Sequence, residues 1–272
     1  MELHEYSTMR SLEDNYWWYV GLRDLLLALT GRHCDLSAPL RILDAGCGTG
    51  GTLSFLAKAL PRSSLFGVDA EAAAVDLARR REVGTVVQAS VNELPFASAA
   101  FDLVVCLDVL YFKGVEESRA LDELARVLKS AGLAVINVPA YEFLRGEHDL
   151  AVDTRHRYTA KELRDALERA GFQIRGITYW NTVLFPLGVA WRRVRRRPRR
   201  GAAPTSDLSA LPRWLNGLLT RLIKREVRMA SRISLPFGIS IMAVAKRVAS
   251  GESPVSRSGN RWQRRSKEET PA

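Results

Sequence analysis

The sequence has few cysteines and no long uncharged apolar run, and these absences exclude several classes of protein. Its three cysteines, Cys34, Cys47 and Cys106, are scattered and form no C-x-x-C pair. This spacing argues against structural zinc and disulfides, and it predicts a reducing, cytoplasmic environment. No uncharged segment approaches the ~20 apolar residues that a membrane-spanning helix needs. The first residues also lack the basic flank and apolar core that are typical of a signal peptide.

Acidic residues are scarce in the last third of the chain. Residues 1–189 carry 20 Lys and Arg against 25 Asp and Glu, whereas residues 190–272 carry 20 against 5. The formal net charge of +10 is therefore the sum of −5 and +15. Because the basic residues are confined to one segment, the high pI alone does not predict that the whole domain binds nucleic acid.

A glycine-rich turn lies between an apolar run and a helix-like pattern. The run Arg41-Ile-Leu-Asp-Ala-Gly-Cys-Gly-Thr-Gly-Gly51 is followed by apolar residues at helical spacing from Leu53 to Leu60. Glycine permits positive φ and lets a ligand lie against the backbone. The N-terminus of the following helix adds unpaired N–H groups to the same space. The order strand, turn, helix therefore predicts a ligand-binding loop.

Two interpretations of this loop compete. Gly46, Gly48 and Gly51 satisfy the dinucleotide fingerprint G-x-G-x-x-G, and Asp69 follows a second expected strand at about the distance of the ribose-binding acid. Asp44 argues against a dinucleotide, because this carboxylate at the strand end would face the pyrophosphate. The same carboxylate suits a cationic ligand.

The full run Leu43-Asp-Ala-Gly-Cys-Gly-Thr-Gly50 resembles the first motif of the class I S-adenosylmethionine (SAM) dependent methyltransferases. The resemblance implies SAM as the cofactor, with the glycine loop under its methionine part. It also implies that the acid after the second strand, Asp69, binds both ribose hydroxyls. The loop Ala89-Ser-Val-Asn-Glu-Leu-Pro-Phe96 resembles the adenine-side motif of this family, with Ser90 where an acid is usual. The backbone of Val91 and the side chain of Asn92 are therefore expected to serve adenine instead.

The N-terminal region carries the adjacent tryptophans Trp17 and Trp18. Both cannot face one core on a helix, so we expect one to pack inward and the other to cover a ligand. The resemblance implies a lid over SAM, and a helix that simply caps the sheet edge is the alternative. Arg23 is expected to meet the SAM carboxylate, with a surface ion pair as its alternative. The complete set of expected cofactor-binding residues is Trp18, Arg23, Asp44, Gly46, Cys47, Gly48, Gly50, Asp69, Ala70, Ser90, Val91, Asn92 and Leu107.

The apolar pattern, read with the resemblance, predicts a Rossmann-like α/β fold with a seven-stranded sheet and helices on both faces. Strands are expected at residues 40–43, 64–69, 83–88, 101–110, 133–138 and 171–179. The next convincing strand, residues 238–246, follows about 60 residues later and is expected to lie antiparallel between the fifth and sixth strands. The expected division is a SAM-binding domain with an N-terminal lid helix at 1–180, a basic amphipathic insertion at 181–237, the final strand at 238–248, and a disordered tail at 249–272.

Residues 146–159 concentrate two of the four histidines, two arginines and a tyrosine after the fifth expected strand. Open α/β sheets bind ligands at this edge. The segment resembles the His-Asp…Arg-Tyr-Thr stretch of a bacterial methyltransferase subgroup whose N-terminus also carries Tyr-Trp-Trp. A third ligand for a metal is not evident, so a metal site is not expected.

An imidazole at this edge is able to titrate near neutral pH. We therefore expect His148 to be the general base for an oxygen acceptor, oriented by the neighbouring carboxylate of Asp149, with Tyr158 or Arg157 positioning the substrate. His156 is the rival candidate for the base. Simple ordering of the loop by these side chains is the alternative.

The expected insertion combines apolar and basic residues. Residues 180–191 are apolar and run into the seven arginines of Arg192–Arg200, and residues Pro212–Ile233 have the pattern of a basic amphipathic helix. Interfacial membrane binding requires such a pair of signals, so contact with an anionic membrane surface and a lipid-linked acceptor is one interpretation. Packing of both apolar faces on the sheet or in a dimer is the other.

Together these features predict a SAM-dependent methyltransferase that acts on a small-molecule or lipid-linked acceptor, at oxygen. An NAD(P)-dependent oxidoreductase is the enzymatic alternative, which Asp44 and the lack of a Tyr-x-x-x-Lys pair after the fifth strand oppose. A non-catalytic SAM-fold scaffold or RNA-binding protein is the alternative from another class. The basic run lacks the interleaved aromatic residues on which single-stranded nucleic acid stacks, so nucleic acid is not an expected partner.

Overall fold

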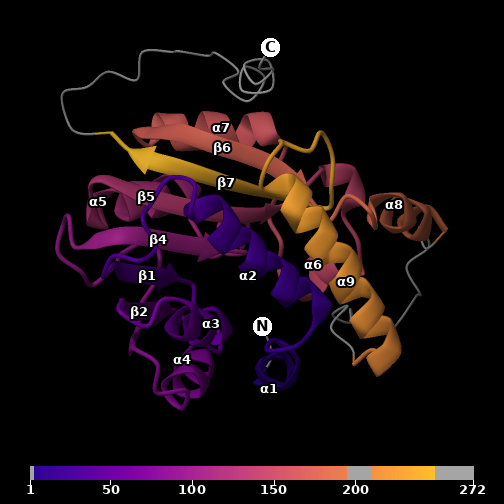
Figure 1. Ribbon diagram of the computed structural model, residues 1–272, viewed down its shortest axis with the longest axis horizontal. Helices are drawn as coiled ribbons and strands as arrows, with labels where there is room; N and C mark the ends of the chain where they lie inside the picture. Colours follow the sequence, from indigo (N-terminus) through magenta and orange to yellow (C-terminus); the bar gives the residue numbers. More distant parts are fainter. Residues whose placement is uncertain (1–2, 195–209, 249–272) are drawn as a thin grey trace, which may run out of the picture.

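The computed structural model describes residues 3–194 and 210–248. Its helices and strands (Figure 1) are, in chain order, α1 (Leu3–Leu12), α2 (Trp17–Thr30), β1 (Arg41–Ala45), α3 (Gly51–Ala59), β2 (Ser64–Asp69), α4 (Ala72–Arg79), β3 (Thr85–Gln88), β4 (Phe101–Leu107), α5 (Glu117–Val127), β5 (Leu128–Pro139), α6 (Glu147–Ala151), α7 (Ala160–Arg169), β6 (Phe172–Trp180), α8 (Phe185–Val194), α9 (Arg213–Ala230) and β7 (Ser240–Arg247).

The strands form one seven-stranded sheet in the order β3-β2-β1-β4-β5-β7-β6. β1 to β5 pair in parallel, and β7 lies antiparallel between β5 and β6. The predicted Rossmann-like sheet with an antiparallel seventh strand is therefore confirmed. The central strands β1 and β4 are apolar and buried on both faces, as parallel strands between two helical layers must be.

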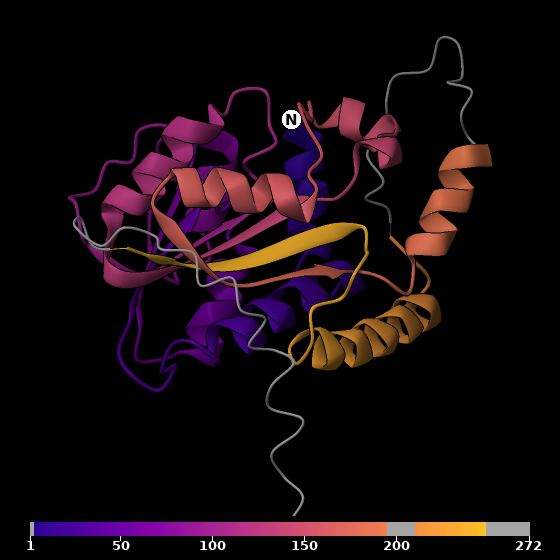
Figure 2. The same cartoon turned by 90° about the horizontal axis from the view of Figure 1, so that it is seen from above.

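Helices cover both faces of the sheet (Figures 1 and 2). Apolar residues of α5 and α7 pack in the core on one face. Those of α2, α3, α4 and α9 belong to the core on the other face. α7 begins with a capping box, because the Thr159 side chain accepts from the N–H of Glu162 and the Glu162 carboxylate accepts from the N–H of Thr159.

The strand order reverses at β1, so β1 and β4 leave a crevice between the connections that follow them. The helices after β1 and β4 lead to opposite faces of the sheet, which is the condition for a ligand site in open α/β folds. The end of β1 carries Asp44, the end of β2 carries Asp69, and Asp108 follows β4 directly. Three carboxylates therefore converge on one edge of the sheet.

The N-terminal region contains more than the single lid helix that was expected. It forms two helices, α1 and α2, that are separated by residues 13–16. The short connection exists because Glu13 and Asp14 both bind Arg81, which draws this segment onto the glycine loop. Sequence periodicity could not show this, because the partners are distant in the chain.

The insertion contributes helix α9, which lies along α2 (Figures 1 and 2). Ile223, Val227 and Ala230 are buried there, and the Asn216 side chain accepts from the N–H of Trp17 at 3.0 Å. Of the two alternatives for this helix, packing of its apolar side on the domain is the one that the structure contains. Most of the predicted basic run Arg192–Arg200 lies outside the described structure, which omits residues 195–200 and the side chains of residues 192–194. The predicted tail 249–272 also lies outside it. Within the described ranges, no helix is both long enough and apolar enough to cross a bilayer.

Candidate active site

The glycine loop is pinned to the neighbouring strand and keeps its backbone open. The N–H groups of Gly46 and Cys47 both donate to the carbonyl oxygen of Val68 at 2.8 Å. Gly46, Gly48 and Gly50 have φ of 87°, 52° and 80°, a region that other residues seldom adopt. A Cβ atom at Gly46 would overlap the side chain of Val109, which follows β4. The loop therefore contacts the end of β4 directly.

Asp44 is a buried carboxylate that lacks a complete set of partners. Its side chain is 2% exposed, and its Oδ2 has no hydrogen-bond donor among the described residues. Burial, followed by the nearby charges of Asp69 and Glu13, raises the pKa of Asp44 to about 8. A buried, unpaired carboxylate is costly, so this position is suited to a ligand that brings a positive charge or a donor.

Asp69 already organises the loop on the other side. Its Oδ2 accepts from the N–H of Gly48 at 2.8 Å, and its Oδ1 accepts from the N–H of Glu71 at 3.1 Å. Burial raises the pKa of Asp69, and the two backbone N–H donors act in the opposite direction. The carboxylate is half-buried, so its free lone pairs remain open to a ligand.

The N-terminal segment closes over the glycine loop. The buried Glu13 carboxylate accepts from the Thr49 hydroxyl and pairs with Arg81 at 2.5 Å. The same carboxylate occupies the space that a side chain at Gly51 would fill, which explains the third glycine of the fingerprint. Met9 of α1 approaches Gly48 in the same way. α1 and its connection to α2 therefore cover the glycine loop.

Helix α2 forms the adjoining part of the same wall. Trp18 and Trp17 both line the cavity, and the Trp18 ring packs against Trp180 with centroids 5.7 Å apart. Arg23 is buried and donates from Nη2 to the carbonyl oxygens of Glu13 and Asp14 at 2.7 and 3.1 Å. Its Nε has no partner among the described residues. Arg23 is thus neither a surface ion pair nor fully satisfied, and it borders the cavity.

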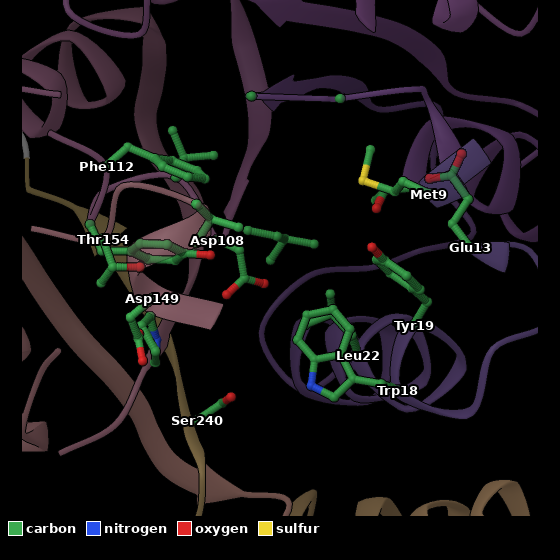
Figure 3. A pocket seen from close by; sticks show the side chains of 18 of the residues that line it. Met9, Glu13, Trp18, Tyr19, Leu22, Asp108, Phe112, Asp149, Thr154 and Ser240 are labelled. Carbon is green, nitrogen blue, oxygen red and sulfur yellow. The ribbon is translucent and has the colours of Figure 1, made fainter. Parts of the chain in front are cut away.

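One cavity of about 1110 Å³ joins these elements (Figure 3). Ligand pockets usually have ~300–1,000 Å³, so this space is large enough for a cofactor and a second molecule. In Figure 3, Met9, Glu13, Trp18, Tyr19 and Leu22 lie on one side of the space, and Phe112, Asp149, Thr154 and Ser240 lie on the other. Of the expected cofactor-binding residues, the cavity is lined by Trp18, Arg23, Asp44, Gly46, Cys47, Gly48, Asp69, Ala70, Ser90, Val91 and Leu107.

Two of the expected cofactor-binding residues do not line the cavity. Gly50 is the N-cap of α3 and faces Ala78 and Arg81 of the neighbouring helix region. Asn92 holds its own loop instead, because its amide donates to the carbonyl oxygen of Gly114 at 3.0 Å and accepts from the N–H of Glu116 at 3.0 Å. Both act on the position of the loops rather than on the cavity itself.

The segment after β5 contributes a buried ion pair. Asp149 and Arg157 are 2% and 4% exposed and pair at 2.7 Å, and both line the cavity. Asp149 also accepts from the N–H of Gly146 at 2.7 Å, so the pair is tied to the backbone. This pair orders residues 146–157 along the side of the cavity away from the glycine loop.

The other predicted catalytic residues lie elsewhere. Tyr158 is a core residue whose hydroxyl donates to Glu117 at 2.5 Å, and it does not line the cavity. His156 also lies outside the cavity lining, with its ring 4.7 Å from that of Tyr158 and within 4.0 Å of Glu142. His148 belongs to α6, and its side chain lies outside the described structure.

Asp108 is a cavity residue that sequence reasoning did not select for chemistry. It follows β4 with φ of 61°, and its carboxylate points into the cavity (Figure 3). Asn137 Nδ2 donates to both of its oxygens at 3.1 and 3.0 Å. Burial raises the pKa of Asp108 to about 7, against the effect of the Asn137 donor and the nearby Arg157. The signal in the sequence was an acid directly after a parallel strand, as for Asp44 and Asp69.

The residues present fit SAM, the cofactor that the glycine motif implies. SAM carries an ammonium and a carboxylate on its methionine part and two ribose hydroxyls. The unpartnered Oδ2 of Asp44 matches an ammonium, and the unpartnered Nε of Arg23 matches a carboxylate. Asp69 retains acceptor capacity for hydroxyl groups, and the glycine loop leaves the backbone exposed between them.

Comparisons with known proteins agree with this site. Residues 43–136 match the family model described as a methyltransferase domain. The chain is 30% identical over 145 residues to the phthiotriol/phenolphthiotriol dimycocerosates methyltransferase 1 of Mycobacterium ulcerans. The aligned segment covers 52% of this chain and 53% of that protein. It is 31% identical to the fatty-acid O-methyltransferase of Mycolicibacterium smegmatis, over 49% of this chain and 44% of that protein. A malonyl-[acyl-carrier protein] O-methyltransferase of Legionella pneumophila is 35% identical, over 35% of this chain and 34% of that protein. The chain thus spans about half the length, or less, of these relatives.

Solved structures share the fold. The geranyl diphosphate C-methyltransferase of Streptomyces coelicolor, solved with S-adenosyl-L-homocysteine, has a TM-score of 0.54 at 17% identity, covering 80% of this chain and 76% of that one. A geranyl diphosphate methyltransferase in complex with SAM has a TM-score of 0.55 at 15% identity, covering 84% and 85%. The family match, residues 43–136, contains the end of β1, the glycine loop and most of β5, which form part of the site described above. Residues 43–136 are therefore similar to a methyltransferase domain, and the chain shares the fold of solved SAM-dependent methyltransferases.

Proposed function

We propose that this chain transfers a methyl group from SAM to an oxygen atom of a small-molecule or lipid-linked acceptor. One observation carries the proposal: the glycine loop and its acids line the same cavity as a second space whose walls are mainly apolar. The cofactor half is bordered by Asp44, Gly48 and Asp69. The acceptor half is bordered by the start of α8, at Leu184 and Leu187.

SAM supplies a methyl group on a sulfonium, which is transferred by in-line displacement. The chain must therefore hold donor and acceptor in line and keep water away. In this proposal Asp44 holds the ammonium of SAM, Arg23 its carboxylate and Asp69 its ribose hydroxyls. Ser90 and the backbone of Val91 border adenine. The lid that Glu13 ties to Arg81 excludes water from the cofactor half.

The relatives support the acceptor class. By their names, they act on phthiotriol dimycocerosates, on a fatty acid and on malonyl-acyl carrier protein, all of which are lipids or precursors of lipids. Two of the three are named O-methyltransferases. An apolar acceptor half is the feature that such substrates need, because burying an acyl chain removes apolar surface from water.

The test is transfer of labelled methyl from SAM with the purified chain. We would incubate the protein with SAM carrying a labelled methyl group, together with fractionated lipids and small metabolites, and identify labelled products by mass spectrometry. We expect label on an oxygen of an apolar product and an equal amount of S-adenosylhomocysteine. Asp69→Ala is the control variant, because it weakens cofactor binding. Reduction of a substrate with NADPH, without response to SAM, would contradict the proposal.

An apolar acceptor suggests that the chain also binds to an anionic membrane surface. The outer side of α9 exposes Trp214, which is 72% exposed, together with Arg221, Arg225 and Arg228. Leu187 on α8, at the edge of the cavity, is 66% exposed. Exposed apolar residues next to basic ones favour an anionic interface. Sedimentation with phosphatidylglycerol vesicles, at low and high salt, tests this, and a protein that stays in the supernatant at low salt would contradict it.

A further inference from the structure

The acceptor half of the cavity has mainly apolar walls, two ion pairs (Asp149 with Arg157, and Asp153 with Lys113) and one further acidic group, Asp108. Its walls come from the loop after β4, from α6, from the first turn of α8 and from the start of β7. The apolar residues among its lining are Val109, Phe112, Val115, Val152, Leu184, Leu187 and Ile239. Asp108 stands where this half meets the cofactor half, because the next residue, Val109, contacts Gly46.

A chain of hydrogen bonds fixes the orientation of Asp108. The indole Nε1–H of Trp180 donates to Asn137 Oδ1 at 2.8 Å. An indole N–H only donates, so the Asn137 amide must turn its oxygen toward Trp180 and its NH₂ toward Asp108. That NH₂ donates to both Asp108 oxygens. The Asp108 carboxylate thus retains free lone pairs on the side of the cavity, and the donor behind it cannot rotate away.

The charges around Asp108 select the kind of acceptor. Each cation that lines the cavity already has an acceptor: Arg157 has Asp149, Lys113 has Asp153, and Arg23 has the carbonyl oxygen of Glu13. Among the described side chains, none of Lys, Arg or His lies within ion-pair distance of Asp108. A carboxylate acceptor at this position would face a like charge without a counter-ion, which costs several-fold to orders of magnitude in affinity. A hydroxyl group would instead donate to Asp108.

We propose that the acceptor is an alcohol on an aliphatic chain, and that Asp108 takes its proton during methyl transfer. This inference rests on the proposed function. The O–H proton passes to the Asp108 carboxylate, a bond forms between the acceptor oxygen and the methyl carbon, and the bond from that carbon to the SAM sulfur breaks with its electron pair on sulfur. A neutral alcohol, a sulfonium and a carboxylate become a neutral ether, a neutral thioether and a neutral carboxylic acid, so atoms and charge balance. Asn137 and Trp180 are positioning residues.

The pH dependence has a defined sign. The pKa of Asp108 is raised to about 7, so the base is largely protonated below that pH and ionised above it. The other groups that face Asp108 are Arg157, Tyr19, Tyr111 and Cys106. Burial raises the pKa of both tyrosines and of the thiol, so these groups stay neutral from pH 6 to 8. The kcat/KM for an alcohol should therefore rise with pH and level off above about pH 7.

The experiment compares three probes of equal chain length: 1-dodecanol, dodecanoate and dodecylamine. With wild-type protein and SAM, S-adenosylhomocysteine should form with dodecanol alone. Asp108→Asn should lower kcat by ~10²–10⁴ and remove the pH dependence, while the affinity for SAM stays within a few-fold of wild type. Asp102 lies at the start of the same strand β4 and does not line the cavity. Asp102→Asn is therefore the matched control and should behave as wild type. Trp180→Phe keeps an aromatic side chain but loses the indole N–H donor, and it should lower kcat more than it changes KM.

Binding provides a readout that does not depend on turnover. In calorimetric titrations of the protein loaded with S-adenosylhomocysteine at pH 8, dodecanol should bind at least tenfold more tightly than dodecanoate. Asp108→Asn should narrow this difference, because the like charge is removed. Methylation of dodecanoate or dodecylamine, equal binding of alcohol and acid, or full activity of Asp108→Asn would each overturn the inference. Failure of SAM itself to bind would overturn the proposed function instead, so the two failures are distinguishable.

Discussion

The unpaired carboxylate of Asp44 predicts that SAM binding depends on pH. Burial and the charges of Asp69 and Glu13 raise the pKa of Asp44 to about 8. Below that pH, the free protein holds Asp44 protonated, whereas pairing with an ammonium requires the carboxylate. Binding must therefore release a proton, and falling pH opposes it. One pKa unit corresponds to about 1.4 kcal/mol, so the affinity should fall nearly tenfold for each pH unit between 7 and 6.

Calorimetric titration with SAM at pH 6, 7 and 8 measures this dependence directly. Repeating each titration in buffers of different ionisation enthalpy gives the number of protons released, which should approach one per SAM bound at pH 6. The thiols near Asp44, Cys47 and Cys106, do not contribute, because burial raises the pKa of both. Asp44→Asn should bind SAM more weakly at pH 8 and without this pH dependence. Equal affinity at pH 6 and 8, or a slope that persists in Asp44→Asn, would refute the reasoning.

Three further changes test the cofactor half and the packing of the insertion. Asp69→Ala should weaken SAM binding by about ten- to a hundred-fold, since hydrogen bonds to a charged group contribute ~1.5–3 kcal/mol, and calorimetry measures the loss. Arg81→Ala leaves the buried Glu13 carboxylate without its cationic partner, so the segment before α2 should detach and become sensitive to limited proteolysis. The control variant Arg80→Ala, which changes an exposed residue, should leave this segment resistant. Glu226→Gln should lower the free energy of unfolding in urea by about 1–3 kcal/mol, because the buried carboxylate accepts from two backbone N–H groups after β6 and an amide NH₂ cannot. An unchanged urea midpoint would contradict the last expectation.

The features that the sequence could predict are those set by local pattern and strand order. Apolar runs followed by Asp44 and Asp69 indicated parallel strands with acids at their carboxyl ends, and such ends meet at one edge of the sheet. The antiparallel seventh strand was also predictable, because the family resemblance implied its place in the sheet and an apolar run remained after a long insertion. Thr159 and Glu162 identified the start of α7, because a capping box is a local signal.

The features that escaped prediction depend on contacts between distant residues. α1 is held on the glycine loop through Glu13 and Arg81, which are 68 residues apart. Asp108 becomes a candidate base only when Asn137 and Trp180, from β5 and β6, are known to orient it. Tyr158 was expected to position the substrate, but the chain turns its ring into the core, where its hydroxyl donates a hydrogen bond to Glu117. Spacing along the chain carries none of this information.

The central claim is that the cavity binds SAM and that the glycine loop with its two acids is a methyltransferase site. Parallel calorimetric titrations of the full chain with SAM and with NADH at pH 8 test it most directly. We expect one SAM to bind per chain with a dissociation constant in the range of about 1–100 µM, corresponding to ~5.5–8 kcal/mol, and we expect no measurable heat with NADH. Binding of NADH without any response to SAM would contradict it.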